Sequence, residues 1–175
     1  GEAAAFFKDD ELSASAWRAT LALASKLEPC PGIGGHCVPD ATGRVKTGAQ
    51  ALIAMAALAS AALAPDAARR RFRDIARELG HRLIVARRQA SPAQVFVHFW
   101  QPQEGVFKPL GEHQLYADGQ ASLALWRLRH LDQQFGSVAL AALEDQAARL
   151  ASAPKALRRF AEIHWFVIAV SEAWE

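Results

Sequence analysis

The stretch that decides the fold is Tyr116-Ala117-Asp118-Gly119-Gln120-Ala121-Ser122-Leu123-Ala124-Leu125-Trp126-Arg127-Leu128. Its polar, glycine-containing entry leads straight into a segment that is apolar almost all round. Asp118 is placed to cap the first free amides of a helix, where the helix dipole also favours a carboxylate. A helix with so little polar face must be buried among other helices. We therefore expect its entry to open at one end of a helical bundle, where a binding cleft would lie.

Composition agrees with a helical protein that forms a single domain over residues 1–175. The chain has 175 residues, of which 51% are hydrophobic and 22% charged, and Ala is the dominant residue. The net charge of +2 says little about partners. No apolar run reaches the roughly 18 to 20 residues of a membrane span. The nearest, residues 49–64, is expected to be a buried core helix, so we predict no membrane span.

Hydrophobic periodicity predicts six helices that alternate between outer and inner positions. The outer helices are amphipathic, and the inner ones are nearly free of charge. Residues 90–115 break this rhythm, and residues 95–107 predict a short β-hairpin or irregular insertion with a turn at 101–105. The helices are expected over 11–27 (outer), 46–63 (inner), from Pro65 (outer), 116–132 (inner), from beyond Gly136 to about 152 (outer) and from Pro154 to the end (inner).

The arginines of the helix after Pro65 have two possible meanings. They fill the faces that Phe72, Ile75, Leu79 and Leu83 leave free, and acids interrupt them. A nucleic-acid surface would require aromatic side chains among the cations to stack on bases, and none occurs here. A solvated outer face is therefore the preferred interpretation, and we expect no nucleic-acid partner.

Cys30 and Cys37 lie in Cys-Pro-Gly-Ile-Gly-Gly-His-Cys, a tight loop that a disulfide could close. Two free thiols are the second possibility. A zinc site with His36 is the third, although no fourth ligand is evident and the spacing matches no common zinc motif. Only the disulfide would favour a periplasmic or secreted location. The chain opens at Gly1 without a Met, which predicts a processed or trimmed N-terminus.

The inner segments share a pattern. Gly48-Ala49-Gln50-Ala51-Leu52 and Gly119-Gln120-Ala121-Ser122-Leu123 each place Gly before a small-residue and Leu run, and His164-Trp165 enters the last inner segment. Together these stretches resemble the (α/α) toroids, in particular the six-hairpin-glycosidase-like superfamily. The matching segments are 46–58, 116–128 and 164–172. A complete toroid of that kind has about twelve helices, twice the number predicted here. The resemblance thus implies a larger protein, a second chain that completes the ring, or an open bundle.

The resemblance also implies an active site at the entry ends of the inner helices. Glycoside hydrolysis requires two carboxyl groups across the scissile bond, and Asp118 with Glu112 is the best local pair, with Glu162 a distant alternative. A lyase or epimerase acting on a uronic acid would use Tyr or His instead. The candidate catalytic residues are Asp118, Glu112, Tyr116 and His164. The candidate substrate-binding residues are His113, Gln120, Trp165, Trp100 and Lys46, with Phe107 a further ring that could stack on a sugar.

Each candidate also has a purely structural interpretation. Asp118 could be only a helix cap, Tyr116 a core residue with a hydrated hydroxyl, and His164 a buried, hydrogen-bonded histidine. Trp165 could be core packing, and Glu112 and His113 ordinary loop residues. His81, His98 and His130 show no metal-ligand spacing and are not candidates. No phosphate loop, nucleophile elbow or zinc-helix motif occurs, so we expect no metal and no cofactor.

These features predict a carbohydrate-active protein that acts on a polysaccharide or oligosaccharide by acid–base chemistry, whether hydrolysis, elimination or epimerisation. The alternative is a non-catalytic helical-repeat module that binds a glycan or a protein partner. A third possibility is a structural half-domain, whose inner helices would form a large apolar surface.

Overall fold

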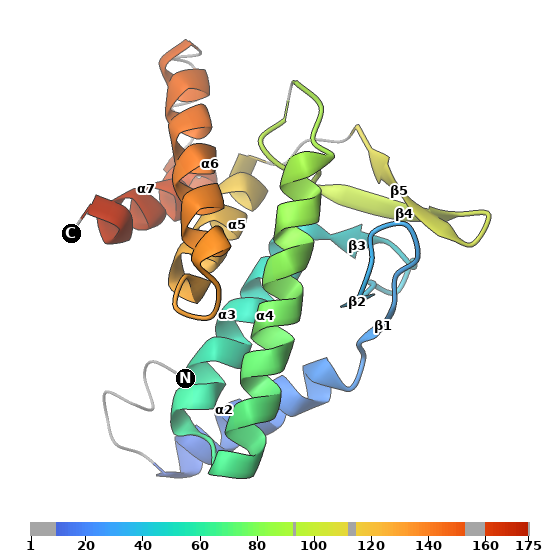
Figure 1. The fold of residues 1–175 in the computed structure, drawn as a ribbon, viewed down its shortest axis with the longest axis vertical. Helices are drawn as coiled ribbons and strands as arrows, with labels where there is room; N and C mark the ends of the chain where they lie inside the picture. The colour runs from blue at the N-terminus through green and yellow to red at the C-terminus, as the bar shows by residue number, and fades with distance from the viewer. Residues whose placement is uncertain (1–9, 93, 112–114, 153–159, 175) are drawn as a thin grey trace.

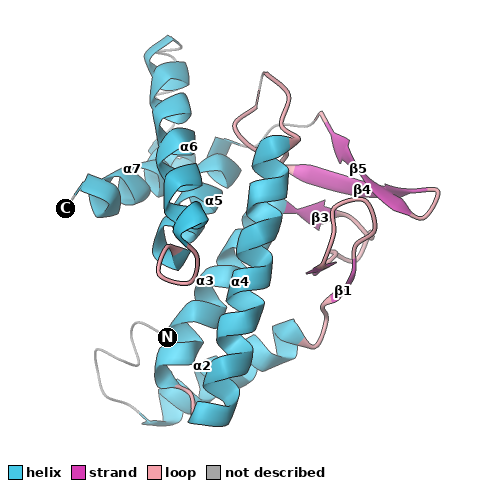
Figure 2. Cartoon of the chain, in the orientation of Figure 1, coloured by secondary structure: helices cyan, strands magenta, loops and turns pink. Residues whose placement is uncertain are grey.

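The computed structural model describes residues 10–92, 94–111, 115–152 and 160–174. This part of the chain is mostly helical, with small antiparallel sheets, which confirms the expected fold class (Figures 1 and 2). The helices are α2 (Asp10–Ala24), α3 (Thr47–Leu63), α4 (Asp66–Arg88), α5 (Leu115–Leu128), α6 (Gln133–Ser152) and α7 (Phe160–Trp174). The strands are β1 (Glu28–Pro29), β2 (His36–Cys37), β3 (Val45–Lys46), β4 (Phe99–Gln103) and β5 (Val106–Leu110).

Helix boundaries follow the sequence signals closely at α3 and α4, and α5 begins where expected but ends at Leu128, before the expected end near residue 132. At α6 the prediction was wrong, because Gly136 lies inside the helix. Asp132 begins that helix instead: its side chain accepts a 2.9 Å hydrogen bond from the amide of Gln134, as an N-cap residue does. Gly136 allows α6 to pack closely against the chain at Arg129, since a Cβ at this glycine would lie 3.3 Å from Cβ of Arg129. Pro154, expected to open the last helix, lies outside the described residues.

The inner helices α3, α5 and α7 run in the same direction, and their N-terminal halves meet. A Cβ at Gly48 of α3 would lie 2.3 Å from Oε1 of Gln120 in α5. A Cβ at Gly119 of α5 would lie 2.9 Å from the carbonyl carbon of Trp165 in α7. Glycine thus permits the close approach of the next inner helix at both junctions.

The C-terminal halves of α5 and α7 also meet, beside the middle of α3. Arg127 of α5 forms a bidentate ion pair with Glu172 of α7, with N–O distances of 2.5 and 3.0 Å. Its other terminal nitrogen lies 4.0 Å from Sδ of Met55 in α3. The indole of Trp126 donates a 2.8 Å hydrogen bond to the carbonyl of Glu172. Contacts at both ends fix the three helices side by side.

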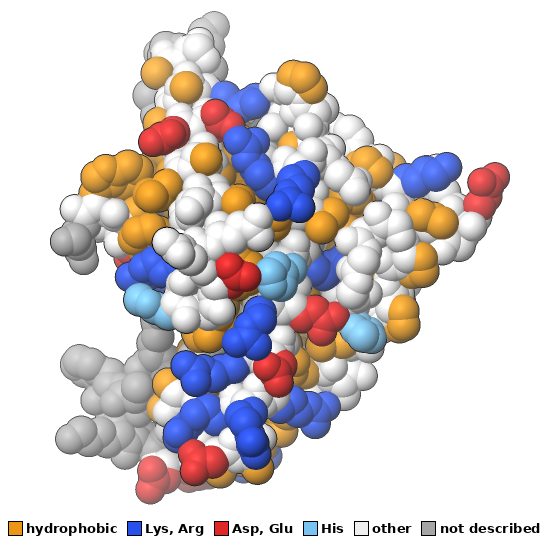
Figure 3. Space-filling view, in the orientation of Figure 1, with side chains coloured by type: hydrophobic (Ala, Val, Ile, Leu, Met, Phe, Trp, Pro, Cys, Tyr) orange, Lys and Arg blue, Asp and Glu red, His pale blue; other side chains and the backbone are white. Residues whose placement is uncertain are grey.

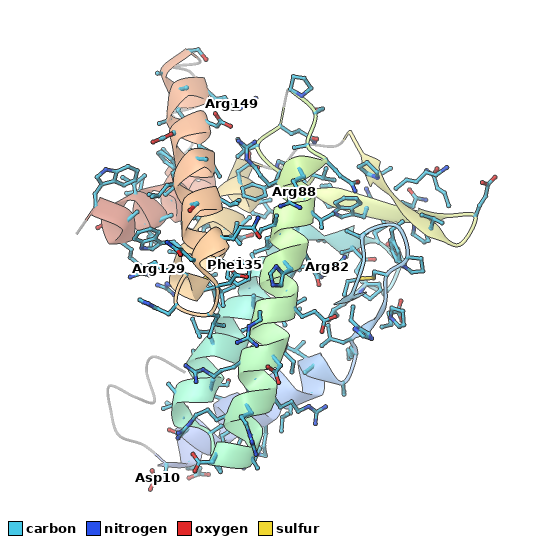
Figure 4. All side chains as sticks on the ribbon, viewed as in Figure 1. Asp10, Arg82, Arg88, Arg129, Phe135 and Arg149 are labelled. Carbon is cyan, nitrogen blue, oxygen red and sulfur yellow. A yellow bond between two sulfur atoms is a disulfide. The ribbon has the colours of Figure 1, made fainter. Side chains whose placement is uncertain are left out.

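The outer helices return antiparallel to the inner ones and share their core. Gln146 of α6 donates a 2.7 Å hydrogen bond to the hydroxyl of Ser122 in α5. Phe135 at the start of α6 is fully buried, and a Cβ at Gly80 of α4 would lie 2.7 Å from its ring (Figure 4). The exposed face of α4 presents arginines to solvent (Figure 3), two of which pair with Asp66 and Asp74.

The hairpin β4–β5 pairs Phe99 with Leu110 and turns at Glu104 and Gly105, which have φ angles of 53° and 77°. Two residues with positive φ are typical of a tight two-residue hairpin turn. Strand β3 adds to the free edge of β4 and pairs Lys46 with Phe99, which places the sheet at the N-terminal end of α3. Among the described helices, none is long and apolar enough to cross a membrane.

Candidate functional site

Asp118 lies in the first turn of α5 and is almost fully buried, with 4% of its surface exposed. Because the helix begins three residues earlier at Leu115, Asp118 is not the cap that the sequence suggested. Its Oδ1 instead accepts hydrogen bonds from Nε2 of His98 at 2.7 Å and from the amide of Phe96 at 3.1 Å. The carboxylate therefore joins α5 to the segment that precedes β4.

His98 is the residue at this site that sequence reasoning missed. Its side chain is fully buried, and it pairs with a carboxylate 20 residues away in the chain. The sequence offers no spacing that links the two residues, because the pairing depends on how the 95–98 segment folds across the helix ends. The one available signal was an imidazole inside the apolar run 95–100, where a buried polar group requires a hydrogen-bond partner.

The 95–98 segment is held by three helices. The amide of Thr47 at the start of α3 donates a 2.9 Å hydrogen bond to the carbonyl of His98, and its hydroxyl donates to the carbonyl of Val97. The amide of Val97 donates to the carbonyl of Ala86 near the end of α4 at 2.9 Å. With Asp118 on the third side, the segment is a fixed cover over the first turns of α3 and α5.

Tyr116, His164 and Trp165 lie at the same end of the inner helices and remain accessible. Tyr116 is 38% exposed, which rules out its interpretation as a core residue. It lies one turn before Gly119, whose backbone packs against Trp165. His164 and Trp165 are half-buried, and their ring centroids are 5.0 Å apart.

Lys46 lies immediately before α3 and forms a 3.0 Å ion pair with Asp40. Both line a groove of about 310 Å³ whose floor includes the apolar side chains Leu23, Leu52 and Ile53. Hydrogen bonds from the hydroxyl of Thr42 and from Lys46 hold the pKa of Asp40 well below its usual range. Asp40 is therefore ionised at neutral pH and cannot act there as a proton donor.

The remaining candidates divide into buried and undescribed residues. Trp100 is 2% exposed, so its ring is not available to stack on a sugar, and Phe107 is also buried. Gln120 is 6% exposed, and its Oε1, which packs against Gly48, has no hydrogen-bond partner among the described residues. Glu112 and His113 lie outside the described residues. Glu162 belongs to the first turn of α7.

The cysteine loop forms a second feature, on the outer face of α4. Cys30 and Cys37 are paired as a disulfide with a Cα–Cα distance of 6.0 Å, within the range usual for such pairs. Nδ1 of His36 contacts Glu78 of α4 at 2.7 Å, so the imidazole has a carboxylate partner. The described residues contain no group of three His, Cys, Asp or Glu side chains suited to a metal.

Arg82 of α4 ties the same loop to the helix and lies in the groove between them (Figure 4). Its guanidinium donates a hydrogen bond to the carbonyl of Gly34. Burial lowers the pKa of Arg82 to about 10, an effect that the negative charge of Glu78 opposes. The groove has a volume of about 440 Å³, and its charged groups contact one another: Asp74 pairs with Arg77, and Glu78 with His36. We therefore interpret this groove as a structural contact between the cysteine loop and α4 and not as a binding site.

Comparison of the chain with protein-family models, with curated proteins and with solved structures found no match.

Proposed function

We propose that this protein acts on a polysaccharide that contains acidic sugars, by elimination or epimerisation at the N-terminal ends of α3, α5 and α7. One observation carries the proposal: among the described residues at this end, Tyr116, Lys46 and His164 are polar and accessible, beside a layer of parallel helices. The ammonium of Lys46 at this end favours a ligand with a carboxylate, such as a uronic acid.

Hydrolysis is the less favoured reaction. It requires one carboxyl group to donate a proton and a second to activate water or to attack the sugar. Asp118 is buried and accepts hydrogen bonds from His98 and from the amide of Phe96. Asp40 is ionised and paired with Lys46. Neither described carboxylate is therefore suited to donate a proton to a glycosidic oxygen.

Elimination from a uronic acid requires groups of the types present. A base removes the proton on the carbon that bears the carboxylate, the electron pair forms a double bond to the adjacent carbon, and the glycosidic C–O bond there breaks. The departing oxygen takes a proton from an acid. We assign His164 as the base and the hydroxyl of Tyr116 as the acid, with Lys46 neutralising the sugar carboxylate. Epimerisation would use the same first step and return the proton to the opposite face.

The test is incubation with polygalacturonate, alginate and hyaluronan. Elimination produces a conjugated double bond that absorbs in the ultraviolet, and epimerisation in D₂O replaces the hydrogen on the reacting carbon with deuterium. General acid–base groups contribute roughly 100-fold or more to a rate, so Tyr116→Phe and His164→Gln should each lower turnover about 100-fold with folding intact. The matched control is His130→Gln, since His130 lies exposed in the α5–α6 turn.

A binding module without catalysis is the second candidate, and the Lys46 groove favours it, since its floor is apolar and a salt bridge lies at its rim. Tyr116 is the only tyrosine of the chain. Isotope-labelled tyrosine therefore gives a single NMR signal that reports on this end of the helices. A shift of that signal on addition of polymer, without product or deuterium exchange, would support the binding module over the enzyme. The absence of both a shift and a product with every polymer would argue against the enzyme and against the binding module.

The disulfide supports a periplasmic or secreted location, because structural disulfides persist in oxidising compartments. Such a location would also give the protein access to extracellular polysaccharide. Intact mass measured under non-denaturing, non-reducing conditions tests the disulfide and thus the location. Protein purified from its native compartment should be about two daltons lighter than the reduced form, because each thiol loses one hydrogen. An equal mass would argue against export.

A further inference from the structure

Helix α4 concentrates the positive charge of the protein. Eight of the 20 Lys and Arg residues and three of the 18 Asp and Glu residues lie in 66–88, which leaves 12 cations against 15 acids in the rest of the chain. The net charge of +2 is thus the sum of a strongly basic helix and an acidic remainder. Lys and Arg side chains gather over the lower, N-terminal half of α4 (Figures 1 and 3). We call the exposed arginines of this half the basic face: Arg69, Arg70, Arg71, Arg73 and Arg77.

Three arginines of the basic face have no carboxylate partner among the described residues. Arg70, Arg71 and Arg73 are exposed, and none of them forms an ion pair within the described part of the chain. The other two arginines pair with Asp66 and Asp74 at N–O distances of 2.9 and 3.0 Å. Exposed pairs of this kind contribute little free energy, so an anionic ligand can replace either carboxylate at small cost. The basic face is therefore available to a polyanion.

A groove of about 480 Å³ lies beside the basic face, between the C-terminal half of α3 and the N-terminal half of α4. The guanidinium of Arg69 is fixed there, because it donates hydrogen bonds to the carbonyls of Ala61 at 3.2 Å and Ala64 at 3.3 Å. Arg73 lies one turn further along α4 and lines the same groove. A guanidinium group recognises a carboxylate through two parallel hydrogen bonds. The groove thus places one fixed guanidinium beside a second one that has no carboxylate partner among the described residues.

The spacing and chemistry of the basic face favour an acidic polysaccharide. Arg70, Arg73 and Arg77 follow helical spacing and span about 10 Å along the helix axis. A polymer of uronic acids carries a carboxylate on each sugar, so it can contact several of these groups at once. A nucleic acid would gain from aromatic side chains that stack on its bases. Phe72 is the one Phe, Tyr or Trp residue of α4, and it is fully buried.

We propose that the basic face of α4 binds an acidic polysaccharide at a second site, at the opposite end of α3 from Lys46. The second contact retains the polymer on the protein, since two contacts with one chain raise its effective concentration at the reaction site. The choice of polymer rests on the proposed function. The presence of a polyanion site rests on α4 and its groove alone.

Fluorescence anisotropy of labelled polygalacturonate fragments tests the binding, in a His164→Gln background so that turnover does not shorten the fragments. We expect binding at about 20 mM salt that is much weaker at about 200 mM, because salt screens exposed charges. The double variant Arg70→Gln/Arg73→Gln should lower the affinity about tenfold, the usual worth of two exposed charge contacts. The matched control is Lys26→Gln/Lys108→Gln, which removes the same charge from exposed positions outside α4. It should change the affinity by no more than about twofold.

Three results would overturn the inference. The first is no binding at low salt, and the second is an equal loss of affinity in both double variants with their circular dichroism unchanged, which would assign the binding to net charge. The third is stronger competition by single-stranded DNA than by unlabelled polygalacturonate at equal charge, which would indicate a nucleic-acid surface.

The inference and the proposed reaction fail separately. Product from polygalacturonate, with unchanged binding by the arginine variant, would refute the second site alone. Weaker binding by the arginine variant, with no product from any polymer and the wild-type chain, would refute the reaction and retain the basic face as a polysaccharide-binding surface.

Discussion

Helices α5 and α7 are both predicted as inner helices, yet their surroundings differ greatly. Of the side chains described in α5, Tyr116 is exposed, and Trp126 and Arg127 are half-buried; the rest are buried. Of those described in α7, Ala169 is buried, and the others are half-buried or exposed. The sequence of α7 is apolar through residues 165–170. The comparison shows that an apolar sequence indicates that a helix is better buried. Whether it is buried depends on its position in the helix layer, because only a central helix has neighbours on both sides.

The two helices also differ in how their first turns are fixed. At α5, buried hydrogen bonds from Asp118 connect the helix to the 95–98 segment. In the described part of the N-terminal half of α7, Trp165 packs against Gly119 of α5. Hydrogen bonds in the interior are costly to break, because the remaining partners stay buried without water. Polar contacts thus fix the start of α5, whereas the described polar contacts of α7 lie near its other end, at Glu172.

The largest effect expected is that of Asp118→Ala. It leaves His98 and the amide of Phe96 buried without their shared acceptor. We expect a loss of about 3 kcal/mol in the free energy of unfolding, measured by urea titration with circular dichroism. Asp118→Asn retains a carbonyl oxygen that can accept both bonds, so it should cost clearly less. Equal stability of the alanine variant and the wild type would show that the carboxylate does not anchor α5.

Gly119→Ala tests the junction between the two helices. The added Cβ would lie 2.5 Å from the amide nitrogen of Phe166 and 2.9 Å from the carbonyl carbon of Trp165, so backbone must move. Overpacking of this kind costs about 1 to 3 kcal/mol, partly offset by the better helix propensity of Ala. We expect a net loss of about 2 kcal/mol in urea titration.

Gly48→Ala is the matched control for that substitution. Its closest contact is Oε1 of Gln120, the end of a side chain that can rotate away. It should therefore cost less than Gly119→Ala. A reversed order would mean that α7 packs less tightly on α5 than the structure shows.

Local sequence signals predicted some helix positions correctly, whereas contacts between distant residues could not be predicted from the sequence. The charge-free run of α3 and the position of Pro65 before α4 are local signals, and both placed their helices correctly. At α6, Gly136 predicts a break between helices, but the structure places the helix start at Asp132, whose side chain acts as the N-cap. The partnership of Asp118 with His98 and the burial of Trp100 depend on the fold of the 95–98 segment across two helix ends, which no periodicity encodes.

Helix α3 has both buried and exposed polar contacts at its start, because Thr47 bonds the 95–98 segment and the exposed Lys46–Asp40 pair lies just before the helix. The pKa of Asp40 is held below its ordinary value of 3.8 by Thr42 and Lys46. A lowered folded-state pKa means that the stabilisation is complete above about pH 4 and is lost as the pH falls below it. Asp40→Asn should therefore be less stable than the wild type at pH 7 by less than about 1 kcal/mol, as for other surface pairs. The gap should narrow toward pH 2 in urea titrations, and a gap independent of pH would contradict this assignment.

The smallest effect on stability is expected at the far end of α7. Trp174 is 62% exposed, so Trp174→Ser removes little buried surface within one chain and should change the free energy of unfolding by no more than about 0.5 kcal/mol. Urea titration followed by circular dichroism measures this change. A large loss of stability would show that Trp174 packs against its own chain, and the contrast between the central and the edge helix would then be smaller than the exposed fractions indicate.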